Sequence, residues 1–181
     1  APQTTRYRES LTLGLIMGAT ANGIVCFWLI DTMTLFGRFP WPLAALFYAV
    51  IILYAAIPFA AVSMTLRFAG SAAPILLAPA LWVSAEYLFP NFFPWRIAYT
   101  QRDFPILIQS ADIAGPYLLS FAILWFNAAL LRPQRRRLLP ALALIGLLLG
   151  YGAWQMERID KVIQTSPTLR VGLVQGNLSL L

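Results

Sequence analysis

A chain of 181 residues that is 60% hydrophobic and only 11% charged does not fit a soluble globular domain, because soluble domains carry about 25% charged residues. The net charge of +6 comes mainly from arginines in short segments between apolar runs. That pattern is typical of membrane topology signals, so we expect no nucleic acid partner. With no histidine and one cysteine, Cys26, the chain lacks the usual zinc and haem ligands, and we expect no metal and no cofactor.

Five apolar runs are long enough to cross a bilayer, since a spanning helix needs roughly 20 mostly apolar residues. They cover residues 10–30, 43–66, 72–89, 106–131 and 138–156. The expected fold class is therefore an all-α polytopic membrane helix bundle with about five transmembrane helices. In this division residues 1–9 are a cytoplasmic lead-in, 10–160 form the transmembrane bundle, and 161–181 form a periplasmic linker and a first strand.

Arginines predict the orientation of the bundle. Seven cations fall on one side of the five spans and six on the other, so the raw count decides little. The short loop between the last two spans, however, carries four arginines and no acid: Arg132, Arg135, Arg136 and Arg137. By the positive-inside rule this loop lies in the cytoplasm. The N-terminus is then cytoplasmic, and the C-terminus lies in the periplasm of a Gram-negative cell.

The end of the chain differs in kind from the spans. Thr165-Ser166-Pro167 breaks the apolar pattern, and Leu169–Asn177 then reads as a short β-strand that ends in a turn. This run is too short and too polar to span a membrane. We expect it to open a soluble domain that continues beyond Leu181.

Small residues predict close helix contacts. Gly14 and Gly18 are four residues apart with Asn22 on the same face, and Gly146 and Gly150 repeat the spacing. Glycines spaced in this way let helix backbones approach closely in lipid. We interpret both pairs as packing within one bundle.

Two acids lie in or near the predicted spans. Glu86 sits near the outer end of the third run, where an unpaired acid is costly, and Arg96 or Arg102 in the following loop could pair with it. It either lines a polar cavity or holds the following loop in place. Asp112 is expected to face the bundle interior or periplasmic water. No nucleophile–base pair, P-loop or metal cluster is present, so the sequence predicts no catalytic residue on this chain.

Three stretches together resemble the apolipoprotein N-acyltransferase family. They are Ala78-Pro79-Ala80-Leu81-Trp82 followed by Glu86, then Phe93-Pro94-Trp95 with Tyr99, Gln101, Gln109, Ala111 and Gly115, and finally Val171–Asn177. The last is similar to the opening strand of the family's periplasmic α/β nitrilase-like domain. The matched loop departs from the family pattern at Phe89, Pro90 and Phe92, and Pro116 departs further on.

The resemblance implies a function in the bacterial inner membrane. Such enzymes take an acyl chain from a phospholipid, hold it as a thioester, and pass it to the N-terminal cysteine amine of a lipoprotein. Their Glu-Lys-Cys triad would lie beyond Leu181, and two helices expected before the first span would also lie outside this chain. The resemblance marks a substrate or lipid entrance near these residues: Glu86, Phe93, Pro94, Trp95, Tyr99 and Gln101.

Two functions remain open at the level of sequence. As the membrane portion of an acyltransferase, the chain would have phospholipid and lipoprotein substrates as partners. As a catalytically inactive, divergent relative, it would be an accessory or structural subunit that packs against other membrane subunits of a larger inner-membrane complex. A transporter has less support, because no inverted repeat is evident.

Overall fold

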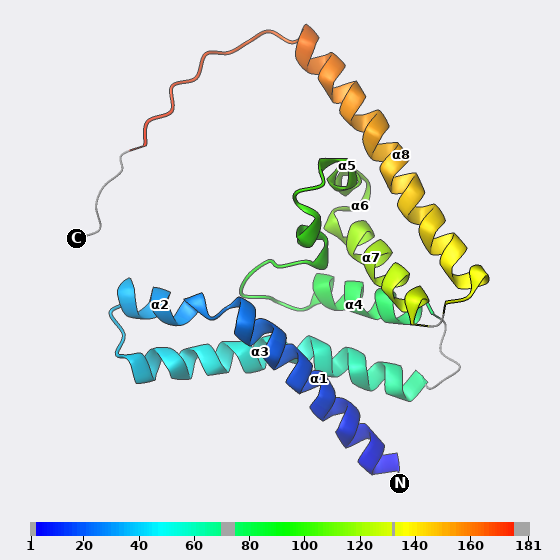
Figure 1. The fold of residues 1–181 in the computed structure, drawn as a ribbon. Helices are drawn as coiled ribbons and strands as arrows, with labels where there is room; N and C mark the ends of the chain where they lie inside the picture. The colour runs from blue at the N-terminus through cyan, green and yellow to red at the C-terminus, as the bar shows by residue number, and fades with distance from the viewer. Residues whose placement is uncertain (1–2, 70–74, 132, 176–181) are drawn as a thin grey trace.

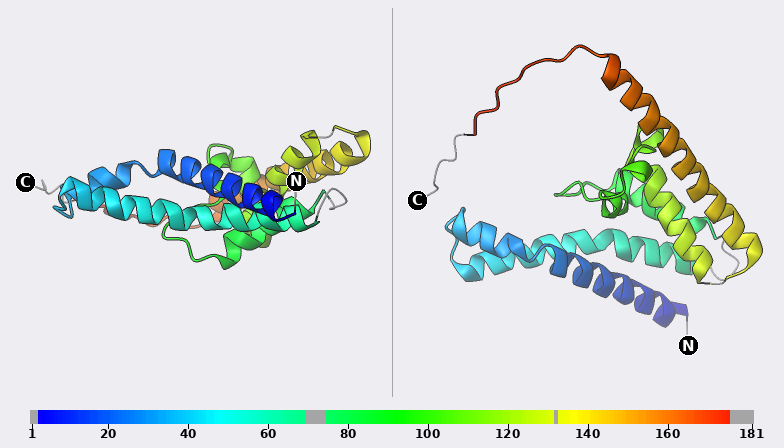
Figure 2. Two further views of the ribbon diagram at one scale, coloured as in Figure 1. Left: turned by 90° about the horizontal axis from the view of Figure 1, so that it is seen from below. Right: turned by 45° about the horizontal axis from the view of Figure 1, so that its top comes forward.

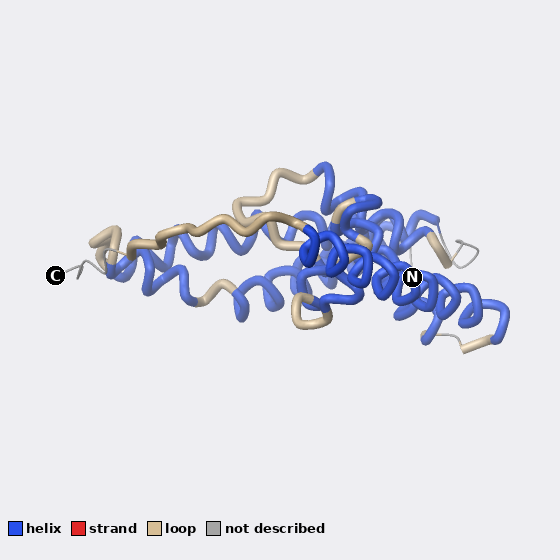
Figure 3. Tube along the Cα trace, turned by 90° about the horizontal axis from the view of Figure 1, so that it is seen from above, coloured by secondary structure: helices blue, strands red, loops and turns tan. Residues whose placement is uncertain are grey.

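The computed structural model describes residues 3–69, 75–131 and 133–175 (Figure 1). Within these ranges all regular structure is helical, as the tube in Figure 3 shows. The elements in chain order are α1 (Gln3–Val25), α2 (Trp28–Leu35), α3 (Trp41–Ala69), α4 (Leu77–Leu88), the 3-10 helix η1 (Ile97–Gln101), α5 (Pro105–Ile108), α6 (Ala111–Ala114), α7 (Pro116–Leu130) and α8 (Arg135–Thr165). The prediction of an all-helical fold is confirmed for the described residues, and some of these helices are candidates to cross a membrane.

Two helices are long and apolar enough to cross a membrane, α3 with 29 residues and α8 with 31. They contain the predicted spans 43–66 and 138–156. The first predicted span is bent by 53° between α1 and α2. At this bend the Leu29 N–H donates to Cys26 O at 3.0 Å, which is the tighter spacing of a 3-10 turn.

Two other predicted spans differ more from the structure. The run 106–131 is not one helix, because α5–α6 and α7 meet at an angle of 117°. Gly115 has a φ of 60° at this break, and Pro116 begins α7. In the run 72–89, α4 has only 12 residues and is about 18 Å long, too short for a hydrocarbon core of about 30 Å. Residues 72–74 lie outside the described ranges.

The predicted segment boundaries shift at both ends of the chain. The lead-in 1–9 is helical from Gln3 onward, and α8 continues through residues 161–165, which were predicted as linker. A Glu157–Lys161 ion pair of 2.7 Å, four residues apart, supports this last part of α8.

The predicted strand at Leu169–Asn177 does not form over residues 169–175, and residues 176–177 lie outside the described ranges. Beyond α8 the chain runs as an extended segment, drawn in orange and red in Figure 1, with Leu173 95% exposed. A strand needs a partner for its backbone hydrogen bonds, and no described residue supplies one here.

Helix α1 packs closely on α3. A Cβ atom at Gly14 would lie 2.7 Å from Ala60 Cα, and one at Gly18 would lie 2.8 Å from Ala56 Cα. Two small-residue faces therefore meet, as predicted for Gly14 and Gly18. Figures 1 and 2 show the two helices side by side.

Helix α8 packs differently from the prediction. A Cβ at Gly146 or Gly150 would meet nothing within 4 Å, so this face is open. The close contact is instead at Gly152, where a Cβ would collide with the backbone of Ile106 in α5. A small cluster of Ala98, Leu119, Ala122 and Leu148 joins η1, α7 and α8.

The outer faces of the helices are strongly apolar. Leu13, Met17 and Ile24 on α1 are 66%, 66% and 76% exposed, and Leu147 on α8 is 70% exposed. Such contiguous exposure would be unfavourable in water and is suited to lipid. Helix α4, η1 and α7 connect the α1–α3 pair to α8, which lies apart from α1 in the right view of Figure 2.

The arginine-rich ends gather at one end of the molecule. The beginning of α1 and the end of α3 lie at the lower right of Figure 1, and α8 begins above them on the same side. They carry Arg8, Arg67 and Arg135–Arg137, with no acid in the first turn of α8. This is the grouping that the charge pattern predicts, and its placement on the cytoplasmic side stays a prediction.

Candidate functional site

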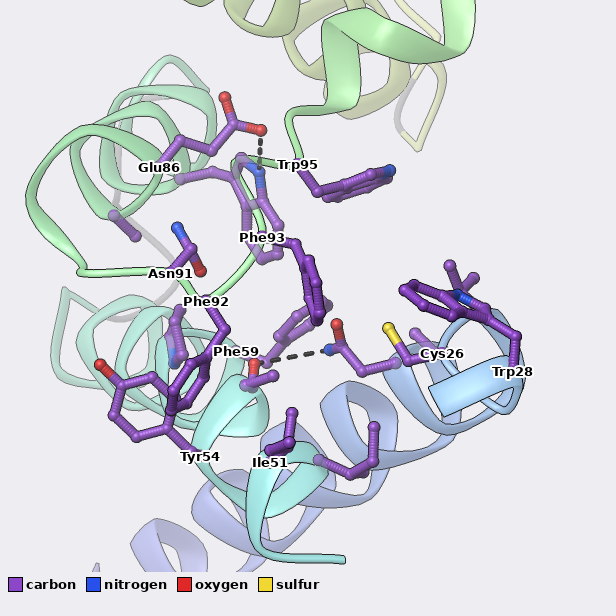
Figure 4. A pocket seen from close by; sticks show the side chains of 18 residues that line it. Cys26, Trp28, Ile51, Tyr54, Phe59, Glu86, Asn91, Phe92, Phe93 and Trp95 are labelled. Atoms are coloured by element: carbon purple, nitrogen blue, oxygen red, sulfur yellow. Dashed lines mark hydrogen bonds between the residues drawn. The ribbon is translucent and has the colours of Figure 1, made fainter. Parts of the chain in front are cut away.

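An apolar pocket of about 310 Å³ opens between α1, α3, α4 and the loop after α4 (Figure 4). Its wall is largely aromatic and aliphatic, with a few polar groups. The lining residues are Ala21, Asn22, Val25, Cys26, Trp28, Ile51, Ile52, Tyr54, Ala55, Pro58, Phe59, Trp82, Ala85, Glu86, Asn91, Phe92, Phe93 and Trp95.

The loop over residues 89–95 is fixed to the helices that it covers. Tyr54 Oη on α3 donates a hydrogen bond of 2.6 Å to Pro90 O. The Tyr54 ring also packs against Phe89 and Phe92, with ring centroids 4.8 and 5.2 Å away. Phe93 reaches across to Trp28 of α2, at 5.6 Å between centroids. The loop therefore forms one side of the pocket.

Glu86 is the buried acid of this site, with 6% of its surface exposed. Its Oε1 accepts hydrogen bonds from Trp82 Nε1 at 3.0 Å and from the Ile97 N–H at 2.9 Å. The second bond ties α4 to the start of η1. Its Oε2 is buried and has no hydrogen-bond partner in the described structure. Glu86 thus both lines the pocket and holds the following loop, so the two readings from sequence describe one residue.

The suggested pairing of Glu86 with an arginine is wrong. Arg96 Nη1 donates to its neighbour Trp95 O at 2.8 Å, and its guanidinium lies 5.6 Å from the centre of the Tyr117 ring. Arg102 instead lies 3.6 Å from the exposed carboxylate of Asp103. The Glu86 carboxylate therefore accepts its hydrogen bonds from a backbone N–H and an indole N–H, because the loop places both arginines away from it.

Asp112 is not part of the pocket. Its Oδ2 accepts hydrogen bonds from Tyr151 Oη at 2.7 Å and Gln155 Nε2 at 3.1 Å, which ties α6 to α8. The residue is exposed, so it faces away from the packed interior. Glu86 and Asp112 serve separate contacts and form no carboxylate pair in the described structure.

Three of the six predicted entrance residues line the pocket: Glu86, Phe93 and Trp95. Pro94 stands between two lining residues. Tyr99 and Gln101 belong to η1 and lie outside the pocket, where Gln101 Nε2 donates to Thr100 Oγ1 at 3.1 Å.

Sequence reasoning missed the contribution of α1. Asn22 and Cys26 are four residues apart, so they share a helix face, and both line the pocket. Asn22 Nδ2 donates to Gly18 O at 2.8 Å. Two polar residues at this spacing inside an apolar run are the available signal, whereas the glycine spacing explains Asn22 only as a packing residue.

The geometry defines a class of protein. Exposed apolar helices, an arginine-rich end and a separate, mostly apolar cavity describe a helical membrane domain with an apolar pocket. Among the described residues no group of three or more histidine, cysteine, aspartate or glutamate side chains is placed to hold a metal ion.

Comparison with known proteins identifies the family. The model of the apolipoprotein N-acyltransferase N-terminal domain matches residues 1–129, and the chain therefore belongs to this family. A Geobacter metallireducens protein named apolipoprotein N-acyltransferase is 31% identical over 186 residues, covering 94% of this chain and 36% of that protein. A Shewanella oneidensis protein of the same name is 30% identical over 171 residues, covering 89% and 32%.

These matches cover only part of the relatives. The chain spans about a third of their length. No solved structure matches the chain well enough to be counted as similar.

Proposed function

We propose that this chain is the membrane domain of an apolipoprotein N-acyltransferase of the bacterial inner membrane, and that its pocket receives an acyl chain of the phospholipid substrate. The acyl chain would pass to the N-terminal cysteine amine of a lipoprotein. The family match supports acyl transfer as the reaction of the whole enzyme. The pocket is the single observation that supports acyl-chain binding by this domain. The N-terminus would be cytoplasmic and the C-terminus periplasmic.

The pocket fits this role in chemistry and in place. Its wall is formed by rings and aliphatic side chains from α1, α3 and the 89–95 loop, while Asn22, Glu86 and Asn91 supply polar atoms. An acyl chain needs an apolar wall, and its ester needs a polar end. We place the covalent chemistry in a nitrilase-like domain with a Glu-Lys-Cys triad, as expected for the family.

The residues that depart from the family pattern, Phe89, Pro90 and Phe92, help to form the wall of the pocket. Phe92 lines the pocket, Phe89 packs on Tyr54, and Pro90 O accepts the Tyr54 hydrogen bond. This arrangement favours a working entrance over an inactive accessory subunit. Recovery of the chain in fixed stoichiometry with unrelated membrane subunits, without N-acylation activity, would favour the accessory role instead.

Filling the pocket tests the proposal. In the full-length enzyme, Cys26→Trp should lower lipoprotein N-acylation more than tenfold, because excluding two methylene groups from an apolar site costs about 1.6 kcal/mol. The measurement is the mass of a lipoprotein's N-terminal peptide before and after reaction. Gly146→Trp, on the open face of α8, adds the same side chain and should leave activity unchanged.

A second variant separates pocket filling from misfolding. Cys26→Ala makes the pocket slightly larger and should keep N-acylation near the wild-type rate. Equal melting temperatures for the two Cys26 variants would show that both are folded. Wild-type activity of a folded Cys26→Trp enzyme would contradict the proposed role of the pocket.

A further inference from the structure

Five arginines form an exposed surface at one end of the helices, which we call the basic end. It consists of Arg8, Arg67, Arg135, Arg136 and Arg137, from α1, α3 and α8. In Figure 1 these helix ends lie on the right-hand side, where the beginning of α1 is paired with the end of α3 and the beginning of α8 lies above them. Only Arg137 is half-buried, and the other four are exposed.

Local contacts hold part of this surface in place. The Tyr7 and Phe68 rings stack with centroids 4.5 Å apart and an angle of 25° between their planes. Ser63 Oγ donates a hydrogen bond of 2.8 Å to Ser10 O. These contacts keep the first described turns of α1 beside the last turns of α3, so Arg8 and Arg67 stand on adjoining helices.

The charge of the basic end is not balanced within the described structure. The ion pairs among the described residues join Arg102 to Asp103 and Lys161 to Glu157, both away from the basic end, so none of its five arginines has a described carboxylate within 4.0 Å. Arg136 Nε donates to Gln134 Oε1 at 2.9 Å, which is a neutral partner. Glu9 is the one acid adjacent to this group in sequence. An anionic partner would therefore meet a largely uncompensated field.

Exposed apolar side chains lie near the arginines in sequence. Exposed fractions are 66% for Leu13, 65% for Phe68, 84% for Leu131 and 61% for Leu139. A nucleic acid or an acidic soluble protein would leave these side chains in water. A partner that carries phosphate groups on hydrocarbon chains satisfies both the cations and the apolar side chains.

We propose that the basic end is a binding surface for anionic phospholipid headgroups, with two-phosphate lipids such as diphosphatidylglycerol bound most tightly. The surface is separate from the acyl pocket, because Arg8 precedes the pocket residue Asn22 by 14 residues of helix, which is about 21 Å. It therefore goes beyond the proposed acyl transfer and does not depend on it.

Native mass spectrometry of the purified chain in detergent tests this surface. Diphosphatidylglycerol should be retained at least tenfold better than phosphatidylcholine with the same acyl chains. The triple variant Arg135→Gln, Arg136→Gln, Arg137→Gln should lose most of this preference, since each arginine near an anionic surface contributes a factor of about five. The preference of the wild-type chain should also fall as ionic strength rises.

A matched variant controls for net charge. The triple Arg38→Gln, Arg158→Gln, Arg170→Gln lowers the net charge of +6 by the same three units, but away from the basic end. It should retain the preference, and circular dichroism should show equal helicity in both triples. Equal loss in the two triples, or no preference in the wild type, would overturn the proposal.

Two competitors identify the source of the phosphate group. Inorganic phosphate should displace no more lipid than chloride does at the same ionic strength, because it offers no hydrocarbon to the exposed apolar side chains. A soluble poly-glutamate peptide should also fail to displace it. Displacement by either competitor beyond that by chloride would contradict a lipid surface.

Discussion

At the scale of single residues, Glu86 connects the fold to the site. One carboxylate oxygen serves both the Trp82 indole and the Ile97 N–H, while the other oxygen is buried beside the pocket. An acid in an apolar helix is costly, and its hydrogen bonds to the loop offset part of that cost. Its effect should therefore be seen first in stability and then in activity.

Replacement of Glu86 separates these roles. Glu86→Ala leaves two donors without their acceptor and should lower the free energy of unfolding by about 1–3 kcal/mol, whereas Glu86→Gln keeps a carbonyl oxygen and should cost less. Thermal unfolding in detergent, followed by near-UV dichroism of the tryptophans, measures both. In the full-length enzyme Glu86→Ala should also lower N-acylation. A Glu86→Ala protein with wild-type melting temperature and full activity would refute this account of Glu86.

At the scale of helices, the packing of α1 on α3 depends on the absence of Cβ atoms. Gly18→Ala places a methyl group against the α3 backbone at Ala56 and should destabilise the chain by about 1–3 kcal/mol. Gly146→Ala meets nothing within 4 Å and should stabilise by up to about 1 kcal/mol, because alanine favours helix. Unfolding titrations in mixed micelles with sodium dodecyl sulfate give both values. Changes of the same sign in the two variants would argue against this interface.

Hydropathy predicted the long helices well and the breaks poorly. α3 and α8 were predictable because an apolar run of that length has few alternatives to a spanning helix. The breaks at Cys26–Phe27 and at Gly115 fall inside continuous apolar runs, where hydropathy does not change. Gly115 followed by Pro116 is a turn signal, but the long apolar run around it favours one continuous span over 106–131.

The candidate site was predictable only in part, for a related reason. Phe93 and Trp95 were found because the loop resembles a family pattern. The contribution of α1 was not found from the sequence. Cys26 and Tyr54 line the same pocket only because α1 and α3 pack through small residues that are far apart in the chain. Such long-range contacts leave little trace in a single sequence.

At the scale of the whole molecule, the arginines and the pocket lie at different places along the helices. The arginine-rich basic end lies at one end of α1, α3 and α8, and the pocket lies toward the opposite end of α1. Helix α8 has 31 residues and is about 46 Å long, enough to pass through the hydrocarbon core and both headgroup layers. Gln134 immediately precedes α8 and Ser166 immediately follows it, so we expect these two residues to face opposite compartments.

Cysteine accessibility in intact Gram-negative cells tests this arrangement directly. In a Cys26→Ala background, Ser166→Cys should react with a membrane-impermeant maleimide added from outside. Gln134→Cys, which keeps all the arginines, should react only after the inner membrane is opened. Labelling of both positions from the same side would contradict the membrane arrangement on which the proposed acyl pocket depends.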